Sequence, residues 1–336
     1  MGEVDALLER AGIARDADVE FFALAHLGTE LVGCMGLAGD VVKCTAVEES
    51  LRGTNLVAPL LMEVRYAAIE RGHGRLFVYA RPKNARVFSA LGFRPLAEVP
   101  DLAVLMEDDP RGIERYQASL SAMVRQGERI GAVVINANPF TLGHEYLLRA
   151  AAADCDIVHV FVVGEDRSLY TYGERFHMVN SGVAQMPERD RIVVHGGSRY
   201  VVSGSTFPQY FLKDAPDVSR AYTGIDLQLF RGYIAPVLGI RHRFVGTEPT
   251  SEITAQYNAE MTYWLCDAPM AAPPIEVHEL QRVGAADQAF VSASKVRALL
   301  RAGRLSDVRR LVPATTYDFL VHKQPWDAVG AGGERS

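Results

Sequence analysis

The sequence predicts an α/β protein in which an α+β domain precedes a doubly wound, Rossmann-like parallel sheet. Its 336 residues suit about two domains at the usual ~100–200 residues each. After residue 128, β-branched runs alternate with helical runs, whereas before residue 107 several strands accompany one amphipathic helix. We therefore expect a first domain over 1–110, a linker helix over 111–128, a second domain over 129–325 and a flexible tail over 326–336.

The composition indicates a globular protein with a substantial core, because 49% of the residues are hydrophobic and 23% are charged. The formal net charge is −6 and no long Lys/Arg run is present, which argues against nucleic-acid binding. No apolar run approaches the ~18 residues that span a bilayer. The acidic N-terminus lacks the apolar segment of a signal peptide, so we expect a cytoplasmic protein. The four cysteines are scattered, which predicts reduced thiols and no cysteine-held zinc.

Short apolar runs before the junction predict the strands of the first domain. They are Glu20–Ala25, Leu31–Leu37, Val41–Val47, Leu76–Ala80 and a strand that starts at Gly92. The segment Pro59–Arg71 has helical apolar spacing, with Leu60, Val64 and Ala67 on one side. A short helix is expected over Asn84–Leu91.

The second domain alternates strands with helices. The expected strands are Ala132–Asn136, Ile157–Val163, Ile192–His195, Arg243–Gly246 and Ile275–Glu279. The expected helices are Gly143–Ala153, Gly173–Gln185, Asp226–Leu238, Ser251–Cys266, Ser292–Ala302, and a last one from Leu305 through Val312 and past Pro313. Strands that are spaced by helices pair in parallel, with both sheet faces covered. A ligand should then lie beyond the carboxyl ends of the strands, at the switch point.

The first polar motif, Asn136 to His144, follows the first strand of this sheet. Gly143 permits a close approach to the backbone, and the helix that starts there offers free N–H groups to a phosphate. His144 and the hydroxyl of Thr141 could donate to the same oxygens. The alternative is that Thr141 only caps the helix and His144 is an ordinary half-exposed histidine.

The second polar motif is Val291-Ser-Ala-Ser-Lys-Val-Arg297, after the last strand. Ser292 or Ser294 can cap the following helix, and Arg297 lies one turn further on. Hydroxyls, helical N–H groups and a guanidinium would together bind anionic oxygens. The alternative is a capped helix with a surface arginine.

The segments "NPFTLGH" and "VSASKVR" resemble the H-x-G-H and I-S-x-T-x-x-R signatures of the nucleotidyltransferase superfamily. The closer resemblance is to the citrate lyase ligases, in which "NANPFTLGH" is typical. The segments "RFVGTEP", "TYGERFHMV" and "YIAPVLGI" also look like that family, and the match runs from about Arg129 to about His322. Malonate decarboxylase ligases are near relatives and stay open as an alternative.

The resemblance implies an ATP-dependent acid–thiol ligase. Acetate and ATP would form acetyl-adenylate and pyrophosphate, and the acetyl group would pass to the thiol of the citrate lyase acyl carrier subunit. Mg²⁺ would be held by ATP oxygens and water, so no metal ligand from the protein is expected. The expected catalytic residues are His144, Thr141 and Arg297. The expected nucleotide-binding residues are Asn138, Phe140, Gly143, Gly246, Glu248, Ser292, Ser294 and Lys295.

Two further polar residues are candidates for substrate contacts. Arg175 could reach a phosphate or the carboxylate, or it could be an idle arginine on a helix surface. Asp226 could contact substrate or simply cap a helix. His159 and His195 lie within apolar strands and are expected to be core histidines. Thr141 stands where many superfamily members have their first histidine, and it can donate a hydrogen bond but cannot carry positive charge.

Residues 41–96 resemble the Gcn5-related N-acetyltransferases. In active members a glycine-rich turn holds the pyrophosphate of acetyl-CoA, but here only Gly53 remains while Asn55 and Val57 replace the usual glycines. We therefore expect this domain to hold the pantetheine-like arm of the carrier, or only to pack. Two other functions stay open for the whole chain: adenylyl or acetyl transfer to a pantetheine-type small molecule, and a non-catalytic assembly factor.

Overall fold

The structure is a computed structural model of the full chain. It describes residues 2–164, 169–201, 215–246, 259–281 and 291–323. The backbone contacts divide the chain into two compact units, Met1–Tyr116 with Thr206–Ile225, and Gln117–Ser205 with Asp226–Ser336. One boundary between the units falls within helix α4 (Gly112–Ser121) and another within helix α7 (Ala215–Leu229). In the described segments no helix has the length and apolar character needed to cross a membrane.

The first unit contains a six-stranded sheet of mixed direction. Its strands are β1 (Phe21–Leu27), β2 (Glu30–Ala38), β3 (Val41–Val47), β4 (Phe77–Ala80), β5 (Arg94–Val99) and β6 (Ala103–Glu107). Their order in the sheet is β1-β2-β3-β4-β6-β5. Only β3 and β4 pair in parallel, and every other neighbouring pair is antiparallel.

Two helices cover opposite faces of this sheet. Helix α2 (Val57–Glu70) packs its buried side, which includes Val64, against a cluster that contains Met35. Helix α1 (Gly2–Arg10) packs against a separate cluster that contains Cys34. Because successive residues of a strand point to opposite faces, the two clusters lie on the two sides of the sheet. A short helix, α3 (Ala85–Ala90), precedes β5.

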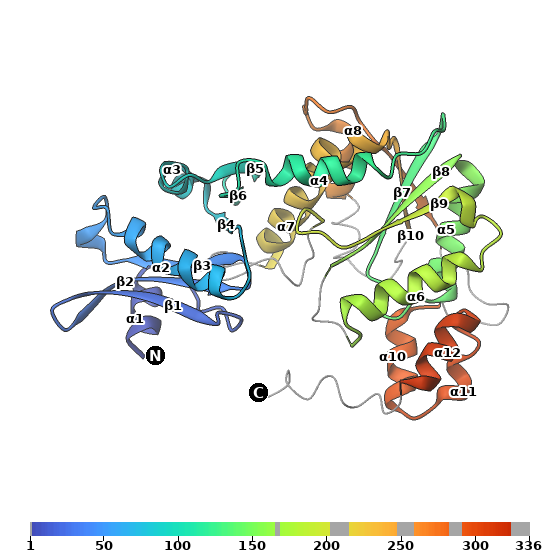
Figure 1. Ribbon diagram of the computed structural model, residues 1–336, viewed down its shortest axis with the longest axis horizontal. Helices are drawn as coiled ribbons and strands as arrows, with labels where there is room; N and C mark the ends of the chain where they lie inside the picture. The colour runs from blue at the N-terminus through green and yellow to red at the C-terminus, as the bar shows by residue number, and fades with distance from the viewer. Residues whose placement is uncertain (1, 165–168, 202–214, 247–258, 282–290, 324–336) are drawn as a thin grey trace. The chain divides into compact units, whose positions relative to one another are not determined.

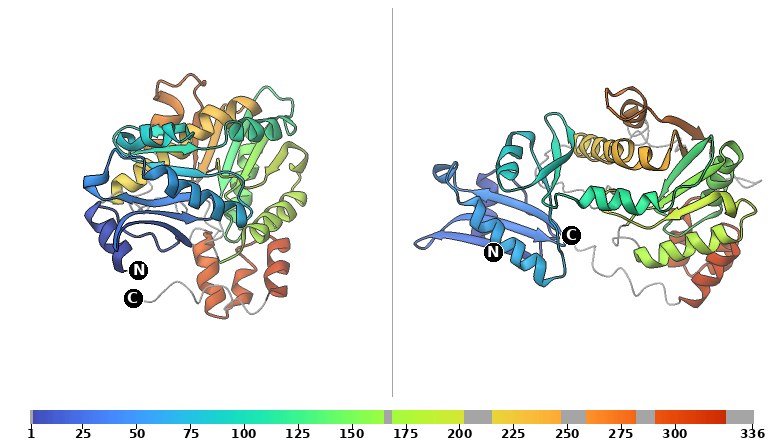
Figure 2. Two further views of the ribbon diagram at one scale, coloured as in Figure 1. Left: turned by 60° about the vertical axis from the view of Figure 1, so that its left-hand side comes forward. Right: turned by 45° about the horizontal axis from the view of Figure 1, so that its top comes forward.

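The second unit contains a five-stranded parallel sheet, which confirms the predicted fold class. Its strands are β7 (Ile130–Ile135), β8 (Ile157–Val162), β9 (Ile192–His195), β10 (His242–Gly246) and β11 (Glu276–Leu280). Their order is β11-β10-β7-β8-β9, so the winding reverses at β7. The switch point therefore lies between the carboxyl ends of β7 and β10. Figure 2 shows these strands from two further sides, with colours that run from green for β7 to orange for β11.

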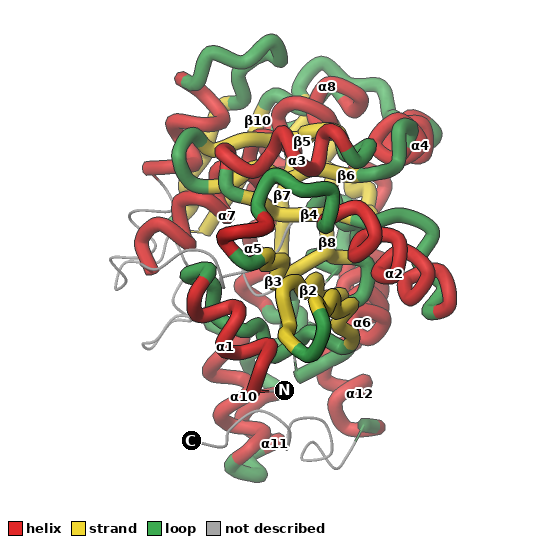
Figure 3. The backbone as a smooth tube through the Cα atoms, turned by 90° about the vertical axis from the view of Figure 1, so that its left-hand side faces the viewer, coloured by secondary structure: helices red, strands yellow, loops and turns green. Residues whose placement is uncertain are grey.

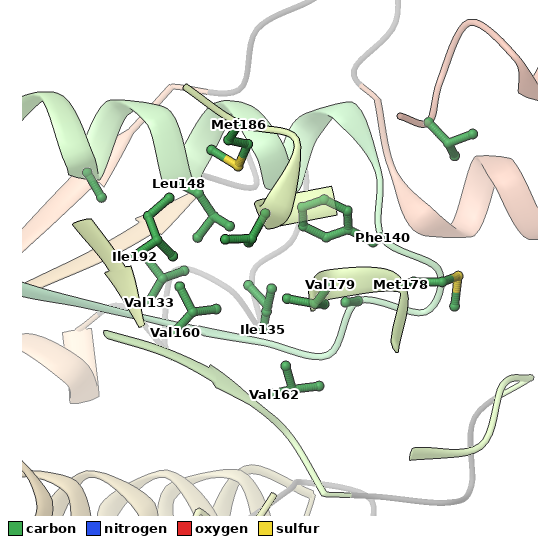
Figure 4. Packing of buried hydrophobic residues seen from close by; sticks show 14 of the residues in the cluster. Val133, Ile135, Phe140, Leu148, Val160, Val162, Met178, Val179, Met186 and Ile192 are labelled. Atoms are coloured by element: carbon green, nitrogen blue, oxygen red, sulfur yellow. The ribbon is translucent and has the colours of Figure 1, made fainter. Parts of the chain in front are cut away.

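Helices cover both faces of the second sheet (Figure 1). Val160 and Val162 of β8 belong to the core cluster beneath α5 (Leu142–Asp154) and α6 (Tyr172–Ala184). Phe161, between them in the strand, contacts Phe230 of the opposite layer at 5.7 Å between ring centroids. Figure 4 shows the core cluster beneath α5 and α6, in which Val133 and Ile135 of β7 lie among side chains of these helices.

Three short helices complete the second unit. They are α10 (Ala293–Arg301), α11 (Leu305–Val308) and α12 (Ala314–His322). Helices α10 and α11 lie side by side (Figure 3), and Leu300 and Val308 belong to the same core as the sheet.

Several expected elements differ in extent. The helix that was expected to begin at Asp226 begins earlier, as α7 (Ala215–Leu229), and continues through a π-helical turn into α8 (Ala235–Leu238). The expected last helix is two separate helices, because α11 ends at Val308 and α12 begins at Ala314 with Pro313 as its N-cap residue. Helix α1 and strand β6 were not predicted, because their runs are short. The first half of the helix expected over Ser251–Cys266 lies outside the described residues, and the described half ends in a π-helical turn over Tyr263–Asp267.

Candidate functional site

A cavity of about 480 Å³ opens at the switch point of the parallel sheet. The ends of three strands contribute to it, through Asn136 after β7, Gly246 of β10 and Leu280 of β11. The first turns of α5 and α10 complete it, so both sequence motifs line the same cavity. The lining residues that the motifs supply are Asn136, Thr141, Leu142, Gly143, His144, Val291, Ser292, Ala293 and Ser294.

The loop between β7 and α5 holds a constrained backbone. Ala137 has φ +52°, in the left-handed region that costs a non-glycine residue roughly 1–2 kcal/mol. The next residue, Asn138, is 9% exposed. Its side-chain Oδ1 has no hydrogen-bond partner among the described residues. Such strain is maintained only where surrounding contacts fix the loop, which is common at functional sites.

A capping box joins Thr141 to His144 at the start of α5. The Thr141 Oγ1 accepts from the His144 backbone N–H at 3.4 Å, and the Thr141 backbone N–H donates to His144 Nδ1 at 3.0 Å. Because Nδ1 is an acceptor in the second bond, a neutral His144 carries its proton on Nε2. Thr141 therefore caps the helix and also fixes His144 as a donor through Nε2.

The second motif begins α10 with a similar cap. Ser292 is the N-cap residue and accepts from the Lys295 backbone N–H at 3.1 Å. Arg297 donates from Nη2 to Ser294 Oγ at 2.9 Å and from Nη1 to the Asn138 carbonyl at 2.7 Å. Arg297 thus connects the two motifs. Arg297 itself, like Asn138, is not among the residues that line the cavity.

Gly143 provides a second connection between the motifs. A Cβ atom at this position would lie 2.8 Å from the Val291 carbonyl oxygen, which is closer than real Cβ contacts. The sequence suggested that this glycine admits a ligand to the backbone. In the structure the close neighbour of Gly143 is Val291 of the second motif. Because Gly143 has no side chain, the starts of α5 and α10 can lie against each other.

The electrostatics of the cavity favour an anion. Two helix N-termini face it, each with a partial positive charge of roughly half an elementary charge. Among the described lining residues, His144 and Arg310 can carry positive charge, and none is a carboxylate. Burial lowers the pKa of Arg297, and Arg301 adds to this effect.

Two of the expected contact residues lie in the core instead. Phe140 is fully buried and does not line the cavity. Its ring stacks on that of His144, with centroids 5.8 Å apart, and packs against Gly182, where a Cβ would lie 2.5 Å from it. Phe140 therefore orients His144.

Arg175 is also fully buried, so neither expectation for it holds. Its Nη1 donates to the carbonyls of Asn136 and Val163 at 2.8 Å, and its Nε donates to the Tyr170 carbonyl at 3.3 Å. A buried guanidinium needs such partners. It fixes the ends of β7 and β8 and does not itself line the cavity, although it donates to Asn136, which does.

The remaining expected site residues are placed as follows. Asp226 is 6% exposed inside α7 and neither begins a helix nor lines the cavity. Lys295 is exposed on α10, outside the lining. Gly246 lines the cavity as expected. Glu248 lies outside the described residues.

Three polar lining residues were not predicted from the sequence, namely Tyr146, Gln281 and Arg310. Arg310 is the most informative, because it adds a cation from the segment after α11. The Leu142 backbone N–H donates to the Leu311 carbonyl at 3.0 Å, which brings this segment to the start of α5. Only the tertiary contact reveals it, since Arg310 belongs to no motif.

His159 and His195 are core histidines, as expected. Both are almost fully buried, and His159 Nδ1 lies 2.7 Å from His195 Nε2. The His195 ring stacks on Phe161 with centroids 4.5 Å apart. Neither histidine lines the cavity.

The model of the citrate lyase ligase C-terminal domain family matches residues 130–320. A [citrate [pro-3S]-lyase] ligase of Escherichia coli K12 is 42% identical over 95% of this chain and 90% of its own length.

Among solved structures, a nicotinic acid mononucleotide adenylyltransferase of Plasmodium falciparum aligns with a TM-score of 0.35 and 12% identity. That alignment covers 59% of this chain and 97% of the other. Escherichia coli ElaA aligns with a TM-score of 0.28 and 17% identity, and the alignment covers 32% of this chain and 85% of the other.

Proposed function

The chain belongs to the citrate lyase ligase family, and from that premise we propose how its cavity carries out the ligase reaction. A carboxylate oxygen of acetate attacks the α-phosphorus of ATP, the bond to the β-phosphate bridging oxygen breaks, and pyrophosphate leaves. The thiolate of the citrate lyase acyl carrier then attacks the acetyl carbon, and AMP leaves. The products are the acetyl thioester, AMP and pyrophosphate.

One observation carries the proposal. The N-termini of α5 and α10 line a single cavity at the switch point, with His144 and Arg310 in the same wall. Acetate is already a nucleophile, so the first step needs in-line positioning and donors for phosphate oxygens, and it needs no general base. Both helix starts and His144 Nε2–H are such donors, and a volume of about 480 Å³ suits a nucleotide-sized ligand.

His144 would act on the charge that develops on the phosphates. Because Thr141 holds Nδ1, the Nε2–H group is fixed in direction, and a preorganised donor of this kind needs no reorganisation during the reaction. Arg297 would act through position, because it holds the Asn138 loop against the start of α10 and is not itself among the residues that line the cavity.

Mg²⁺ would accompany ATP and neutralise part of its phosphate charge. Mg²⁺ prefers carboxylate, phosphate and water oxygens, and none of the described lining residues is a carboxylate. The donor set therefore fits a Mg²⁺ ion that is held by the triphosphate and water. The protein would contribute donors to the phosphate oxygens and no direct ligand to the ion.

The first unit would bind the thiol-bearing arm of the carrier. It has a cavity of about 270 Å³ whose lining includes Arg52, Arg81 and Lys83. Val57 also lines it, at the start of α2, where active acetyltransferases keep a glycine-rich turn. A phosphopantetheine-like arm carries phosphate next to an apolar chain, which matches basic residues beside Val57 and Val87.

Pyrophosphate exchange tests the ligase reaction. Radiolabelled pyrophosphate should enter ATP only when acetate is present, because acetyl-adenylate formation is reversible. Exchange that depends on a pantetheine derivative instead of acetate would point to a small-molecule adenylyltransferase. No exchange with any acid would overturn the proposal.

Binding by the full chain tests the role of the first unit. The Arg52→Ala/Lys83→Ala double variant should weaken binding of CoA and of the holo-carrier while acetate-dependent exchange is unchanged. Arg86→Ala, at an exposed position of α3 outside the cavity lining, is the matched control. Equal binding by the double variant and the wild-type chain would remove this cavity from the reaction.

A further inference from the structure

A cluster of three metal-ligating side chains lies on β10 and β11, away from the nucleotide cavity. It comprises His242, Glu276 and His278, and their ligand atoms all lie within 4.8 Å of one another. His242 is the first residue of β10, whereas Gly246, its last residue, lines the cavity. At ~3.3 Å per residue the two sites are separated by roughly 13 Å along the strand. The cluster therefore plays no direct part in adenylation.

The strand register brings the three residues together. In the parallel pairing of β10 with β11, His242 is opposite Glu276. His278 lies two residues after Glu276 and therefore on the same face of the strand. The His278 ring stacks on Phe244 with centroids 4.6 Å apart and 15° between the planes, which fixes the direction of its nitrogens.

The distances match a single tetrahedral ion. His242 Nδ1 is 3.0 Å from His278 Nε2 and 3.3 Å from Glu276 Oε2, and His278 Nε2 is 3.6 Å from Glu276 Oε2. Ligand atoms at ~2.0–2.1 Å from a tetrahedral zinc are separated by about 3.3–3.4 Å from one another. Shifts of a few tenths of an ångström would place all three atoms on one ion.

We propose that His242, Glu276 and His278 form a binding site for a divalent transition-metal ion of the zinc class. Two neutral imidazoles and one carboxylate are a common zinc donor set, whereas Mg²⁺ and Ca²⁺ prefer oxygen ligands. Both histidine side chains are largely buried, at 12% and 19% exposure, while Glu276 is 63% exposed. The exposed carboxylate leaves a path for the ion and for a water molecule as fourth ligand.

The site was not expected from the sequence, which lacks any cysteine-based zinc motif. Strand β11 forms one edge of the sheet and pairs only with β10 within the described residues. An ion that is bound by residues of both strands would stabilise the pairing of β11 with β10 at this edge. Since Gly246 and Leu280 end the same two strands at the cavity, the metal would also stabilise that wall of the nucleotide site.

Zinc titration of the metal-free full chain tests the proposal. One equivalent of Zn²⁺ should bind in competition with a chromophoric chelator and should raise the thermal unfolding midpoint, because an ion that binds only the folded chain stabilises it. Mg²⁺ and Ca²⁺ should do neither. The His242→Gln/His278→Gln double variant lacks two of the proposed direct ligands. Its affinity for Zn²⁺ should therefore fall by more than the roughly 10- to 100-fold that is lost when a residue bonded only to a metal ligand is removed.

Matched variants keep the outcome clear. Glu276→Gln retains the size of the side chain and should weaken Zn²⁺ binding, while His26→Gln, at an exposed position of β1, should not change it. If any variant unfolds, Co²⁺ absorption of the wild-type chain still reports whether the ion has a tetrahedral nitrogen-containing site. Equal Zn²⁺ affinity in the double variant and the wild-type chain, or no Zn²⁺ binding at all, would overturn the proposal. Pyrophosphate exchange is measured separately, so failure here leaves the ligase reaction untouched.

Discussion

The Arg297 guanidinium donates from Nη1 to the carbonyl oxygen of Asn138 at 2.7 Å, across 159 residues of sequence. This bond joins the start of α10 to the loop after β7, and each of these segments carries one of the two polar motifs. The two segments that we propose to bind phosphate are therefore joined, and substitutions in either should affect both.

Arg297→Lys should lower acetate-dependent pyrophosphate exchange by roughly 10- to 100-fold, since a hydrogen bond to a charged group contributes about 1.5–3 kcal/mol. Lysine keeps the positive charge, but it lacks the planar guanidinium that donates to the Asn138 carbonyl and to Ser294 Oγ at the same time. Arg301→Lys, on the same helix, is the control. Wild-type exchange in Arg297→Lys would show that the connection is not needed for adenylation.

His144→Ala should reduce adenylation by on the order of 100- to 1,000-fold, the usual effect of removing one preorganised donor. His144→Asn separates the two roles of this side chain. Its amide oxygen can replace Nδ1 as the acceptor from the Thr141 N–H, but it supplies no donor at Nε2. We expect His144→Asn to unfold like the wild-type chain in urea and to be as inactive as His144→Ala. Near-normal turnover by either variant would exclude His144 from the mechanism.

Thr141→Val should destabilise the folded chain by about 0.5–2 kcal/mol, because it removes the hydroxyl that caps α5. It should also lower exchange, since the capping box orients His144. Thr141→Ser keeps the hydroxyl and should restore both properties. Urea unfolding and exchange assays on the three proteins check this, and a Val variant as stable as the Ser variant would contradict it.

Gly143→Ala should destabilise the chain and lower exchange, although alanine in a helix is usually about 1 kcal/mol better than glycine. The added Cβ would meet the Val291 carbonyl at 2.8 Å and push the two motifs apart. Gly173→Ala is a matched control, because Gly173 has the same place in the first turn of α6 and its Cβ would meet nothing within 4 Å. If the two variants behave alike, the contact with Val291 does not matter.

The His159–His195 pair predicts a loss of stability in acid. Burial lowers the pKa of His159 to about 4 and that of His195 to about 3. The unfolded chain, with the ordinary histidine pKa of about 6.5, binds protons that the folded chain does not. The contribution of this pair to the free energy of unfolding is therefore fully present above about pH 6.5. It is lost as the pH falls towards the pKa values of the two histidines in the folded chain.

Urea unfolding of the wild-type chain and of His159→Leu/His195→Phe at pH 7, 6 and 5 measures this contribution. The wild-type free energy of unfolding should fall more steeply with decreasing pH than that of the double variant. His26→Gln, which changes an exposed histidine, should keep the wild-type slope. Parallel slopes in all three proteins would refute the assignment.

Much of this protein follows from local sequence. Alternating β-branched and helical runs identified β7 to β11 and their parallel pairing, because periodicity reports which faces are buried. The end of β7 is predicted as the ligand edge on a different ground, because ligands of open parallel sheets lie beyond the carboxyl ends of the strands at the switch point. The motif around Thr141 and His144, and the one that starts at Ser292, could be found because helix caps and glycines have short-range signatures.

Tertiary structure alone decided the rest, because it depends on residues far apart in the chain. Arg175 looks like a surface arginine from its helical position, but its place beneath the ends of β7 and β8 makes it a buried partner of carbonyls. Arg310 reaches the cavity only because the segment after α11 folds against α5. His242 and Glu276 meet only through strand register, which no local pattern specifies. Local sequence thus determined the elements and the two polar motifs, whereas the packing between distant elements determined which side chains lie together.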